Sequence, residues 1–356
     1  MNNSPMTNTA ENLIGKTLGD GWLVTEKLTA KHYSTGGNFS ICYLVERNGE
    51  TGFLKALDLS RIFHLPNFMK VLEVATKAHN YECDVLKLCS ARRMSKVVSV
   101  IEHGELLPDI DNTSGQLPVH YLIFELADRS VRDHIATTSK ISNAWLMRSI
   151  HNVAVGLSQL HSSGIAHQDL KPSNVLFFET KKVAKIGDLG RSELRKEESV
   201  FVDLAIAGDP DYAPPELLYH YIDPDWSKRR KATDLYHLGS LLIFFYMKSH
   251  MTALIKAYLP SQYHWKNWAG DYRIVLPYIE EAFETLLQKT ELELKDRVKN
   301  DDLSKEIITI IKQLCHPDPD KRGHPQNRMI EMNRYSLEKY VTLFARLIQK
   351  CEIKSI

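Results

Sequence analysis

Apolar and polar residues alternate in part along five short stretches in the first third of the chain, and each stretch predicts a β-strand. The stretches span residues 21–29, 39–45, 51–57, 97–101 and 121–124. Between the third and the fourth, small and apolar residues recur at helical spacing from Val71 to Cys89, which predicts one long helix. The pattern therefore predicts a five-stranded antiparallel sheet accompanied by one main helix.

One carboxylate interrupts the apolar face of this predicted helix. Glu82 shares that face with seven small or apolar residues. A carboxylate that points into a core is costly unless a cation pairs with it, and Lys55 in the third predicted strand is a suitable partner. Without such a partner, a lysine in a strand would be expected on the solvated outer face. We therefore expect an ion pair between Lys55 and Glu82, whereas Glu73, on the opposite face, is expected to be a surface charge.

Helical patterns dominate the rest of the chain. Helices are predicted at about 143–164, 238–247 and 333–351, and a hairpin at 175–178 and 183–186. Asn143 can cap the first of these helices. The most apolar stretch, 238–247, is about half as long as a membrane span requires, so it predicts a buried helix.

Composition limits the classes to which the protein can belong. With 356 residues, 43% hydrophobic and 25% charged, the chain has the profile of a globular protein with one large domain or two lobes. A net charge of +1 creates no global field for nucleic acid or an anionic membrane. Five cysteines without a C-x-x-C pair argue against a disulfide framework or a zinc site and favour a reducing, cytoplasmic location. Residues 1–13 are expected to be a disordered tail without a secretory signal. The oligomeric state is left open.

Candidate chemistry is concentrated in two motifs. The first is His167-Gln168-Asp169-Leu170-Lys171-Pro172-Ser173-Asn174, and the second, fourteen residues after its end, is Asp188-Leu189-Gly190. One carboxylate can orient an acceptor hydroxyl, while carboxylate and amide oxygens can hold magnesium against phosphates. A polar turn would explain either motif alone. Together they resemble the catalytic loop and the metal-binding turn of eukaryotic-type (Hanks-type) serine/threonine protein kinases.

This resemblance implies a fold and a set of cofactors. The fold is the bilobal α+β protein-kinase fold, with a small lobe at 14–127 that holds the five-stranded antiparallel sheet and its helix. A large, mostly helical lobe would follow at 128–356. ATP would be the phosphoryl donor and Mg²⁺ the metal ion, with Mn²⁺ as an alternative.

The resemblance also implies roles for individual residues. The residues that carry the chemistry would be the catalytic Asp169 and Lys171 and the metal ligands Asn174 and Asp188. The residues around ATP would be Lys55, Glu82, Gly37, Ser40, Glu125, Ala127 and Leu176. Glu125 and Ala127 would bind adenine through backbone groups. When the glycine-rich loop is aligned on Phe39, Gly37 is the one glycine of three that falls in place, and Ser40 stands at the last position.

Further motifs follow in the order expected for the family. The segment from Asp188 to Glu216 resembles an activation segment and ends in Pro-Pro-Glu. Asp234 would bind backbone N–H groups of the catalytic loop, which begins at His167. Glu216 and Arg322 would form a buried ion pair.

Two departures from the family lie beside the catalytic motif. Gln168 replaces the arginine that receives a phosphorylated residue of the activation segment, which argues against activation through that contact. Ser192 and Ser199 remain candidate phosphorylation sites. Asp209 replaces the threonine that links the catalytic aspartate and lysine, and Lys171 could instead form a salt bridge to Asp209.

Three functions are compatible with these motifs. The first is an ATP- and Mg²⁺-dependent protein kinase that phosphorylates Ser/Thr hydroxyls of proteins, including its own, and that could also bind a regulatory protein. The second is a pseudokinase-like scaffold or nucleotide-binding module, which Asp209 and the bulky Phe53 near the adenine site would favour. The third is a small-molecule kinase, such as an aminoglycoside or choline phosphotransferase. That class lacks the Pro-Pro-Glu motif and the Asp234 and Arg322 elements.

Overall fold

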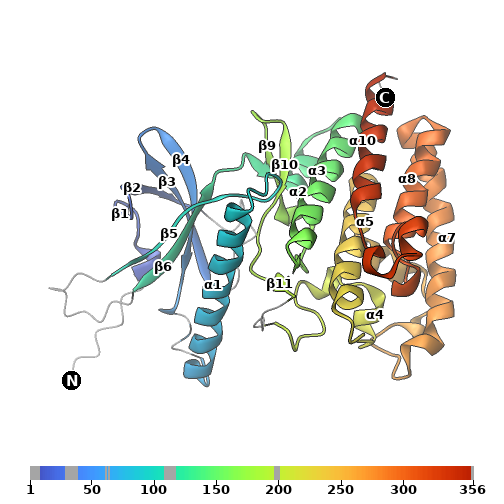
Figure 1. Cartoon of the computed structure of the whole chain (residues 1–356), viewed down its shortest axis with the longest axis horizontal. Coiled ribbons are helices and arrows are strands. Elements are labelled where there is room, and N and C mark those ends of the chain that lie inside the picture. The colour runs from blue at the N-terminus through green and yellow to red at the C-terminus, as the bar shows by residue number, and fades with distance from the viewer. Residues whose placement is uncertain are drawn as a thin grey trace. The chain divides into compact units, whose positions relative to one another are not determined.

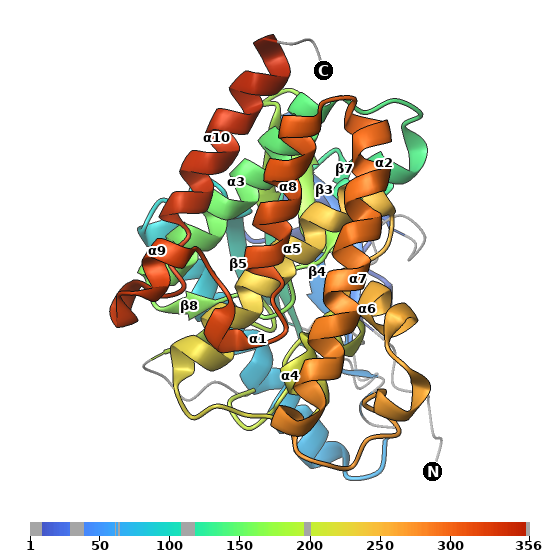
Figure 2. The same cartoon turned by 90° about the vertical axis from the view of Figure 1, so that its right-hand side faces the viewer.

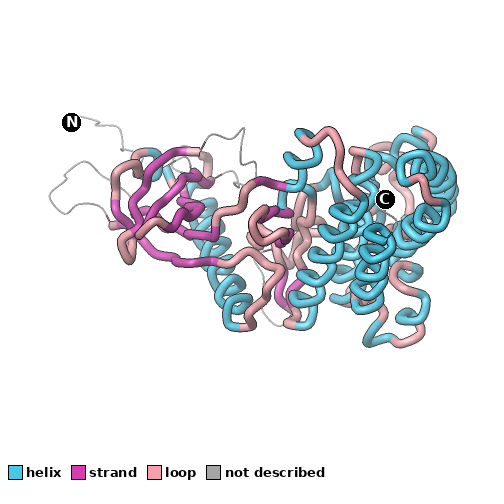
Figure 3. Tube along the Cα trace, turned by 90° about the horizontal axis from the view of Figure 1, so that it is seen from above, coloured by secondary structure: helices cyan, strands magenta, loops and turns pink. Residues whose placement is uncertain are grey.

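The computed structural model describes residues 9–28, 39–60, 62, 65–107, 118–195 and 201–353. These residues divide into two compact units. The first unit takes its residues from Met1–Arg93 and Val97–Asp128, and the second from Met94–Lys96 and Arg129–Ile356. Strands are concentrated in the first unit and helices in the second, as Figure 3 shows. The predicted α+β class, with a strand-rich and a helical part, is confirmed.

A single antiparallel sheet forms the first unit (Figure 1). Its strands are β1 (Thr17–Leu18), β2 (Trp22–Lys27), β3 (Ser40–Arg47), β4 (Glu50–Leu57), β5 (Val100–Leu106) and β6 (Val119–Glu125), in the order β1-β2-β3-β4-β6-β5. The sheet has one strand more than predicted, because the two residues of β1 are too few to produce an alternating pattern. β5 begins at Val100 rather than at residue 97; the buried Val97 and Val98 precede the strand.

The core of this sheet is built around Trp22, Tyr43 and Leu54, all of which are fully buried. Ala10 and Leu13 also belong to this core, and the Tyr43 hydroxyl donates to the carbonyl of Ala10 at 2.6 Å. Residues 9–13, which were expected to belong to a disordered tail, therefore pack against the sheet. Ala10 and Leu13 are only two apolar residues in a polar stretch, which is too few to predict this packing from the sequence.

The main helix, α1 (Phe68–Ala91), contacts β5 and is longer than predicted (Figure 1). Its buried residues lie in the C-terminal half, from Tyr81 to Cys89. The predicted apolar face extended back to Val71, but Val74 is 45% exposed. The N-terminal half of α1 thus carries apolar residues that do not enter the core of the unit.

Long helices form most of the second unit. They are α3 (Asn143–Ser162), α5 (Ala232–Met247), α7 (Tyr272–Val298), α8 (Asp301–Leu314) and α10 (Glu338–Ile353). Shorter helices are α2 (Val131–Thr137), α4 (Pro215–Leu218), α6 (Met251–Tyr258) and α9 (Pro325–Arg328). Figure 2 shows α10 beside α3 and α8 beside α7, while α5, which is buried over most of its length, packs against α3 and α8.

One predicted cap and one predicted helix start in this unit were wrong. The side chain of Ser142, not of Asn143, caps α3, because its hydroxyl accepts the N–H of Trp145 at 3.2 Å. The last helix begins at Glu338 rather than near residue 333, since Glu331–Asn333 forms a separate 3-10 turn. Helix pattern alone does not distinguish such a turn from the first turn of the helix that follows.

Two small sheets of the second unit position the two candidate motifs. The predicted hairpin is present as β9 (Val175–Phe178) and β10 (Val183–Ile186), and β7 (Arg129–Ser130) pairs with β9. β8 (Ile165–Ala166) pairs with β11 (Glu193–Leu194). The first motif therefore lies between β8 and β9, and Asp188 follows two residues after β10.

Among the described residues, no single helix is long and apolar enough to cross a membrane. The segments Ser227–Met247 and Met251–Tyr258 reach that length and composition only as a pair, across a bend of 77°.

Candidate active site

The buried carboxylate of Asp234, in α5, fixes the start of the catalytic motif. Its two oxygens accept the backbone N–H groups of His167 and Gln168, each at 2.8 Å. His161 on α3 adds a third contact at 2.8 Å. Burial alone would raise the pKa of Asp234, but the hydrogen bond and charge of His161 and the contacts to the loop hold that pKa below its usual value. The anchoring role expected for Asp234 thus has a direct geometric basis.

Two residues of the motifs adopt a backbone conformation that is uncommon outside glycine. Gln168 has φ 67° and Asp188 has φ 57°. This backbone conformation has a free-energy cost for a residue other than glycine, and it persists where surrounding contacts stabilise it. One such contact joins the motifs, because the N–H of Gly187 donates to the carbonyl of Asn174 at 2.8 Å. The ring of His167 also lies 3.0 Å from the Gly187 carbonyl.

The carboxylate of Asp169 is the centre of the site. One oxygen accepts the backbone N–H of Asp209 at 2.8 Å. The other accepts the side-chain amide of Asn174 at 3.0 Å and lies 3.1 Å from the ammonium of Lys171. Asp169 is 7% exposed, so its direction is set by these contacts and not by solvent.

Lys171 lies between two carboxylates, as the sequence suggested it could. Its ammonium is 3.1 Å from Asp169 and 3.2 Å from Asp209. Burial disfavours its charge, but the two carboxylates outweigh that effect and raise the pKa of Lys171 above its usual value. Lys171 is therefore a cation that forms ion pairs with two carboxylates at once.

Gly208 allows the activation segment to approach the catalytic motif closely. A Cβ atom at this position would lie 2.4 Å from the carbonyl oxygen of Gln168 and 2.8 Å from the Asp169 carboxylate. Any other residue would push the segment away from Asp169.

Asn174 and Asp188 bear the oxygen donors that Mg²⁺ prefers. Among the described residues, no group of three or more His, Cys, Asp or Glu side chains could hold a metal ion by itself. A pair of oxygen donors fits a magnesium ion that completes its coordination with phosphate oxygens and water.

Lys55 and Glu82 form the expected ion pair within the first unit. The ammonium lies 2.9 and 3.0 Å from the two carboxylate oxygens, and the side chains are 16% and 8% exposed. Glu73 is exposed and pairs with Lys77 one turn along α1, as expected for a surface charge. The pair therefore ties α1 to β4.

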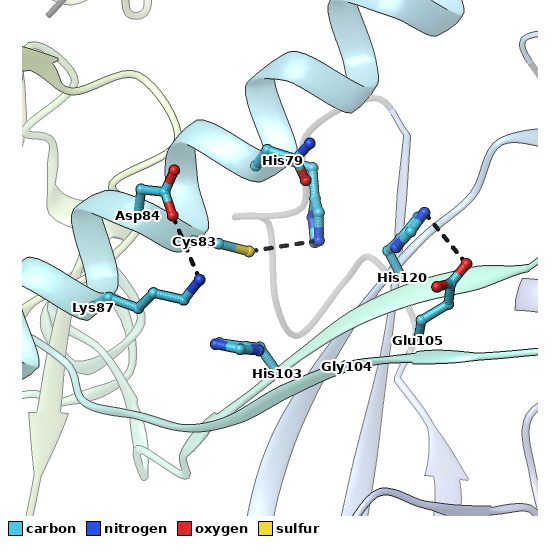
Figure 4. Close-up of a pocket in the computed structure, with 9 residues that line it drawn as sticks. His79, Cys83, Asp84, Lys87, His103, Gly104, Glu105 and His120 are labelled. Atoms are coloured by element: carbon cyan, nitrogen blue, oxygen red, sulfur yellow. Dashed lines mark hydrogen bonds and ion pairs between the residues drawn. The ribbon is translucent and has the colours of Figure 1, made fainter.

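A cavity of about 430 Å³ lies beside the same part of α1 and is lined by α1, β5 and β6 (Figure 4). His79 and Cys83 point toward each other in it, with Nε2 and Sγ 3.6 Å apart. Burial lowers the pKa of His79 to about 4 and raises that of Cys83 to about 11. Both side chains are neutral at pH 7, so neither adds a charge beside Glu82.

Three of the residues expected around the nucleotide, Ser40, Glu125 and Leu176, lie in strands, and the Glu125 carboxylate accepts the backbone N–H of Ser99 at 2.8 Å. Ser40 opens β3, Leu176 pairs with Ser130 and Lys185 inside the β7-β9-β10 sheet, and Glu125 closes β6. Their roles, and that of Ala127, remain predictions, and Gly37 lies outside the described residues.

Phe53 faces Phe124 across β4 and β6, with ring centroids 6.4 Å apart. The bulk that departs from the family pattern therefore packs against a neighbouring strand of its own sheet.

Glu216 and Arg322 form the buried ion pair that their motifs predicted. Arg322 donates through two nitrogens to the two carboxylate oxygens, at 2.7 and 2.9 Å. Arg322 is fully buried, and Glu216 is 4% exposed. The pair joins α4, which ends the activation segment, to the loop after α8.

A second buried pair, Arg230 with Glu193, was not expected from the sequence; its charged groups lie 2.6 Å apart, beside Gln168. Arg230 belongs to the run Lys228–Lys231, and such a run is normally a solvated surface. The Ser192 hydroxyl donates to the Leu189 carbonyl at 2.7 Å and the residue is fully buried, so it is not an accessible phosphorylation site as suggested. Ser199 lies outside the described residues.

Comparison with known proteins yields a match over most of the chain. A family model described as the protein kinase domain matches residues 37–331. The rice serine/threonine-protein kinase/endoribonuclease IRE1 is 28% identical over 185 residues, which are 51% of this chain and 17% of that protein. Protein kinase kin1 of Schizosaccharomyces pombe is 26% identical over 224 residues, 60% of this chain and 23% of kin1. The CBL-interacting serine/threonine-protein kinase 8 of Arabidopsis thaliana is 24% identical over 152 residues, 43% of this chain and 33% of that protein. The chain thus spans a third or less of these relatives.

Proposed function

Because the chain belongs to the protein kinase family, we propose that it is an active enzyme that transfers the γ-phosphate of ATP to Ser/Thr hydroxyls of proteins. One observation carries the proposal: the Asp169 carboxylate is held by Asp209, Asn174 and Lys171 at hydrogen-bond distance. A carboxylate fixed in this way can orient an acceptor hydroxyl and accept its proton.

The surrounding residues support the same chemistry. Mg²⁺-ATP would supply the phosphoryl group, and Asn174 and Asp188 would hold the metal ion. Lys171 can offset charge that develops on the moving group, since its raised pKa keeps it protonated. A lysine two positions after the aspartate also favours Ser/Thr acceptors within the family. Lys55, held by Glu82, would bind phosphates of the nucleotide.

The second candidate is a scaffold or nucleotide-binding module without turnover. Asp209 favours it, because a carboxylate stands where the family has a hydroxyl and competes with Asp169 for Lys171. Against it, the five residues Lys55, Glu82, Asp169, Asn174 and Asp188 are all present. A cytoplasmic location and a regulatory protein partner remain predictions.

The test is phosphoryl transfer from γ-labelled ATP with Mg²⁺, to the protein itself and to a generic protein acceptor. Wild type should label both, and Asp169→Asn should abolish labelling without lowering the thermal midpoint much, because this residue is not part of an apolar core. Asp296→Asn, an exposed aspartate on α7, is the matched control and should behave as wild type. Equal turnover in wild type and Asp169→Asn would refute the role of Asp169. A wild type that binds ATP without turnover would favour the scaffold.

A further inference from the structure

Arg230 is a fully buried arginine in the helical turn Ser227–Lys231, just before α5. Its guanidinium lies 2.6 Å from the carboxylate of Glu193, which is 2% exposed and belongs to β11. Burial lowers the pKa of Arg230, and the charge of Glu193 partly offsets that effect. Removing one member of such a buried pair leaves the other charge uncompensated, so each of the two residues depends on the other.

The same guanidinium contacts two other parts of the active site. One nitrogen lies 3.4 Å from the Val202 carbonyl and 3.2 Å from the Leu204 carbonyl. Another lies 3.4 Å from the side-chain oxygen of Gln168, whose amide donates to the Arg230 carbonyl at 2.9 Å. One side chain therefore joins the catalytic loop, the strand after Asp188, and the activation segment at 201–204.

Two of these parts, the catalytic loop and the activation segment, meet at the Asp169 carboxylate. Gln168 precedes Asp169 in the chain, and the activation segment returns to Asp169 through the N–H of Asp209. The close approach at Gly208 leaves little room for the segment to shift without moving Asp169. A displacement at 201–204 would therefore be transmitted to the acceptor side of the site.

An arginine suits this task because its planar group carries five N–H donors in a fixed geometry. Where a phosphorylated residue orders such a segment, a cation of the protein binds an added anion. Here the cation is Arg230 and the anion, Glu193, is already part of the chain.

We propose that Arg230 is a positioning residue for phosphoryl transfer, with Glu193 as its permanent counter-ion, and that together they order the activation segment without phosphorylation. This inference rests on the proposed kinase activity. It goes further by naming the residues that replace a phosphate-dependent contact.

The adjacent Arg229 provides a matched control. Its nearest nitrogen is 3.7 Å from the Glu193 carboxylate and its side chain is 18% exposed. If any positive charge near Glu193 were sufficient, the two arginines would be interchangeable. The proposal requires that they are not.

The experiment uses the full chain after phosphatase treatment, shown by mass spectrometry to be unphosphorylated. Transfer to a protein acceptor and Mg²⁺-ATP binding are measured for wild type, Arg230→Met, Arg230→Lys and Arg229→Met. Amide hydrogen exchange is followed over residues 201–208. Arg230→Met should lower kcat roughly 10- to 100-fold, as for a misplaced reacting group. It should also speed exchange at 201–208 and leave the Kd of Mg²⁺-ATP unchanged. Arg230→Lys should be intermediate, and Arg229→Met should match wild type.

Arg230→Met leaves the buried Glu193 with only the more distant Arg229 as a counter-ion, so a second variant guards against misfolding. Glu193→Leu with Arg230→Met removes both charges and should restore the thermal midpoint but not kcat. Wild-type kcat in that folded double variant would overturn the proposal. So would an unphosphorylated wild type that becomes active only after phosphorylation within 188–216. If wild type transfers no phosphate at all, the proposed function fails, and the exchange comparison alone then decides whether Arg230 orders the segment.

Discussion

Removing one member of the Glu216–Arg322 pair should strongly destabilise the second unit. Arg322→Met leaves a carboxylate that is 4% exposed without its cation. Breaking a buried ion pair in this way costs about 3–5 kcal/mol. Arg322 also donates to the carbonyls of His316, Pro317 and Ala232, and each lost hydrogen bond adds roughly 1 kcal/mol.

These values predict a large change in thermal stability. For a unit of this size, each kcal/mol lowers Tm by roughly 2–4 °C, so the loss of about 3–5 kcal/mol from the ion pair alone lowers it by roughly 6–20 °C, and the lost hydrogen bonds add to this shift. Tryptophan fluorescence is a suitable probe, because Trp145, Trp226, Trp265 and Trp268 lie in the second unit and only Trp22 lies in the first. Urea unfolding should show a lower midpoint with an unchanged slope.

The neighbouring Lys321 serves as the control. It pairs with Glu280 on the surface, with side chains 52% and 28% exposed, and such pairs contribute about 0–1 kcal/mol. Lys321→Met should therefore shift Tm little. Combining Arg322→Met with Glu216→Ala should cost less than the sum of the two single changes by roughly 1–3 kcal/mol. The reasoning is refuted if Arg322→Met destabilises no more than Lys321→Met, or if the two changes at the pair are additive.

Three further predictions concern other parts of the molecule. Lys55→Met and Glu82→Gln should each impair phosphoryl transfer, and the double variant should lose less than the sum of the two effects in free energy; strict additivity would mean that they act independently. Gly208→Ala should abolish transfer, because its Cβ would lie 2.4 Å from the Gln168 carbonyl, and normal activity would show that the segment can shift. Burial lowers the pKa of His237 to about 4, whereas the unfolded chain binds this proton near pH 6.5. The free energy of unfolding should therefore fall as the pH drops from 6.5 to about 4. His237→Leu should reduce this pH dependence of the urea midpoint, and an unchanged profile would contradict the prediction.

Much of the candidate site could be predicted from the sequence, because its residues belong to short motifs or stand out within one predicted element. Glu82 stands alone on an apolar helical face, so its need for a cation pointed to Lys55. The catalytic loop follows a helix and precedes a hairpin, and this hairpin brings Gly187, next to Asp188, back to Asn174. Glu216 and Arg322 were paired through the order of their motifs.

Other features depend on contacts between distant segments. Val74 fits the apolar face of α1 by spacing, but the buried residues of the helix all lie from Tyr81 to Cys89. β1 and residues 9–13 carry too few apolar residues to produce a pattern, and they become ordered because the sheet offers a surface to pack on.

Arg230 shows most clearly what the sequence pattern alone does not predict. Four basic residues in a row, Lys228–Lys231, have the composition of a solvated face, and periodicity does not say which one is buried. Arg230 is the buried one because it contacts Glu193 and the carbonyls of 201–204. These partners are 26 to 37 positions away in the chain. The sequence by itself determined which residues are candidates for the chemistry, because reactive residue types and their spacing are local. Only the tertiary structure decided what holds that chemistry in place, because a buried charge takes its partner from whichever segment the fold brings to it.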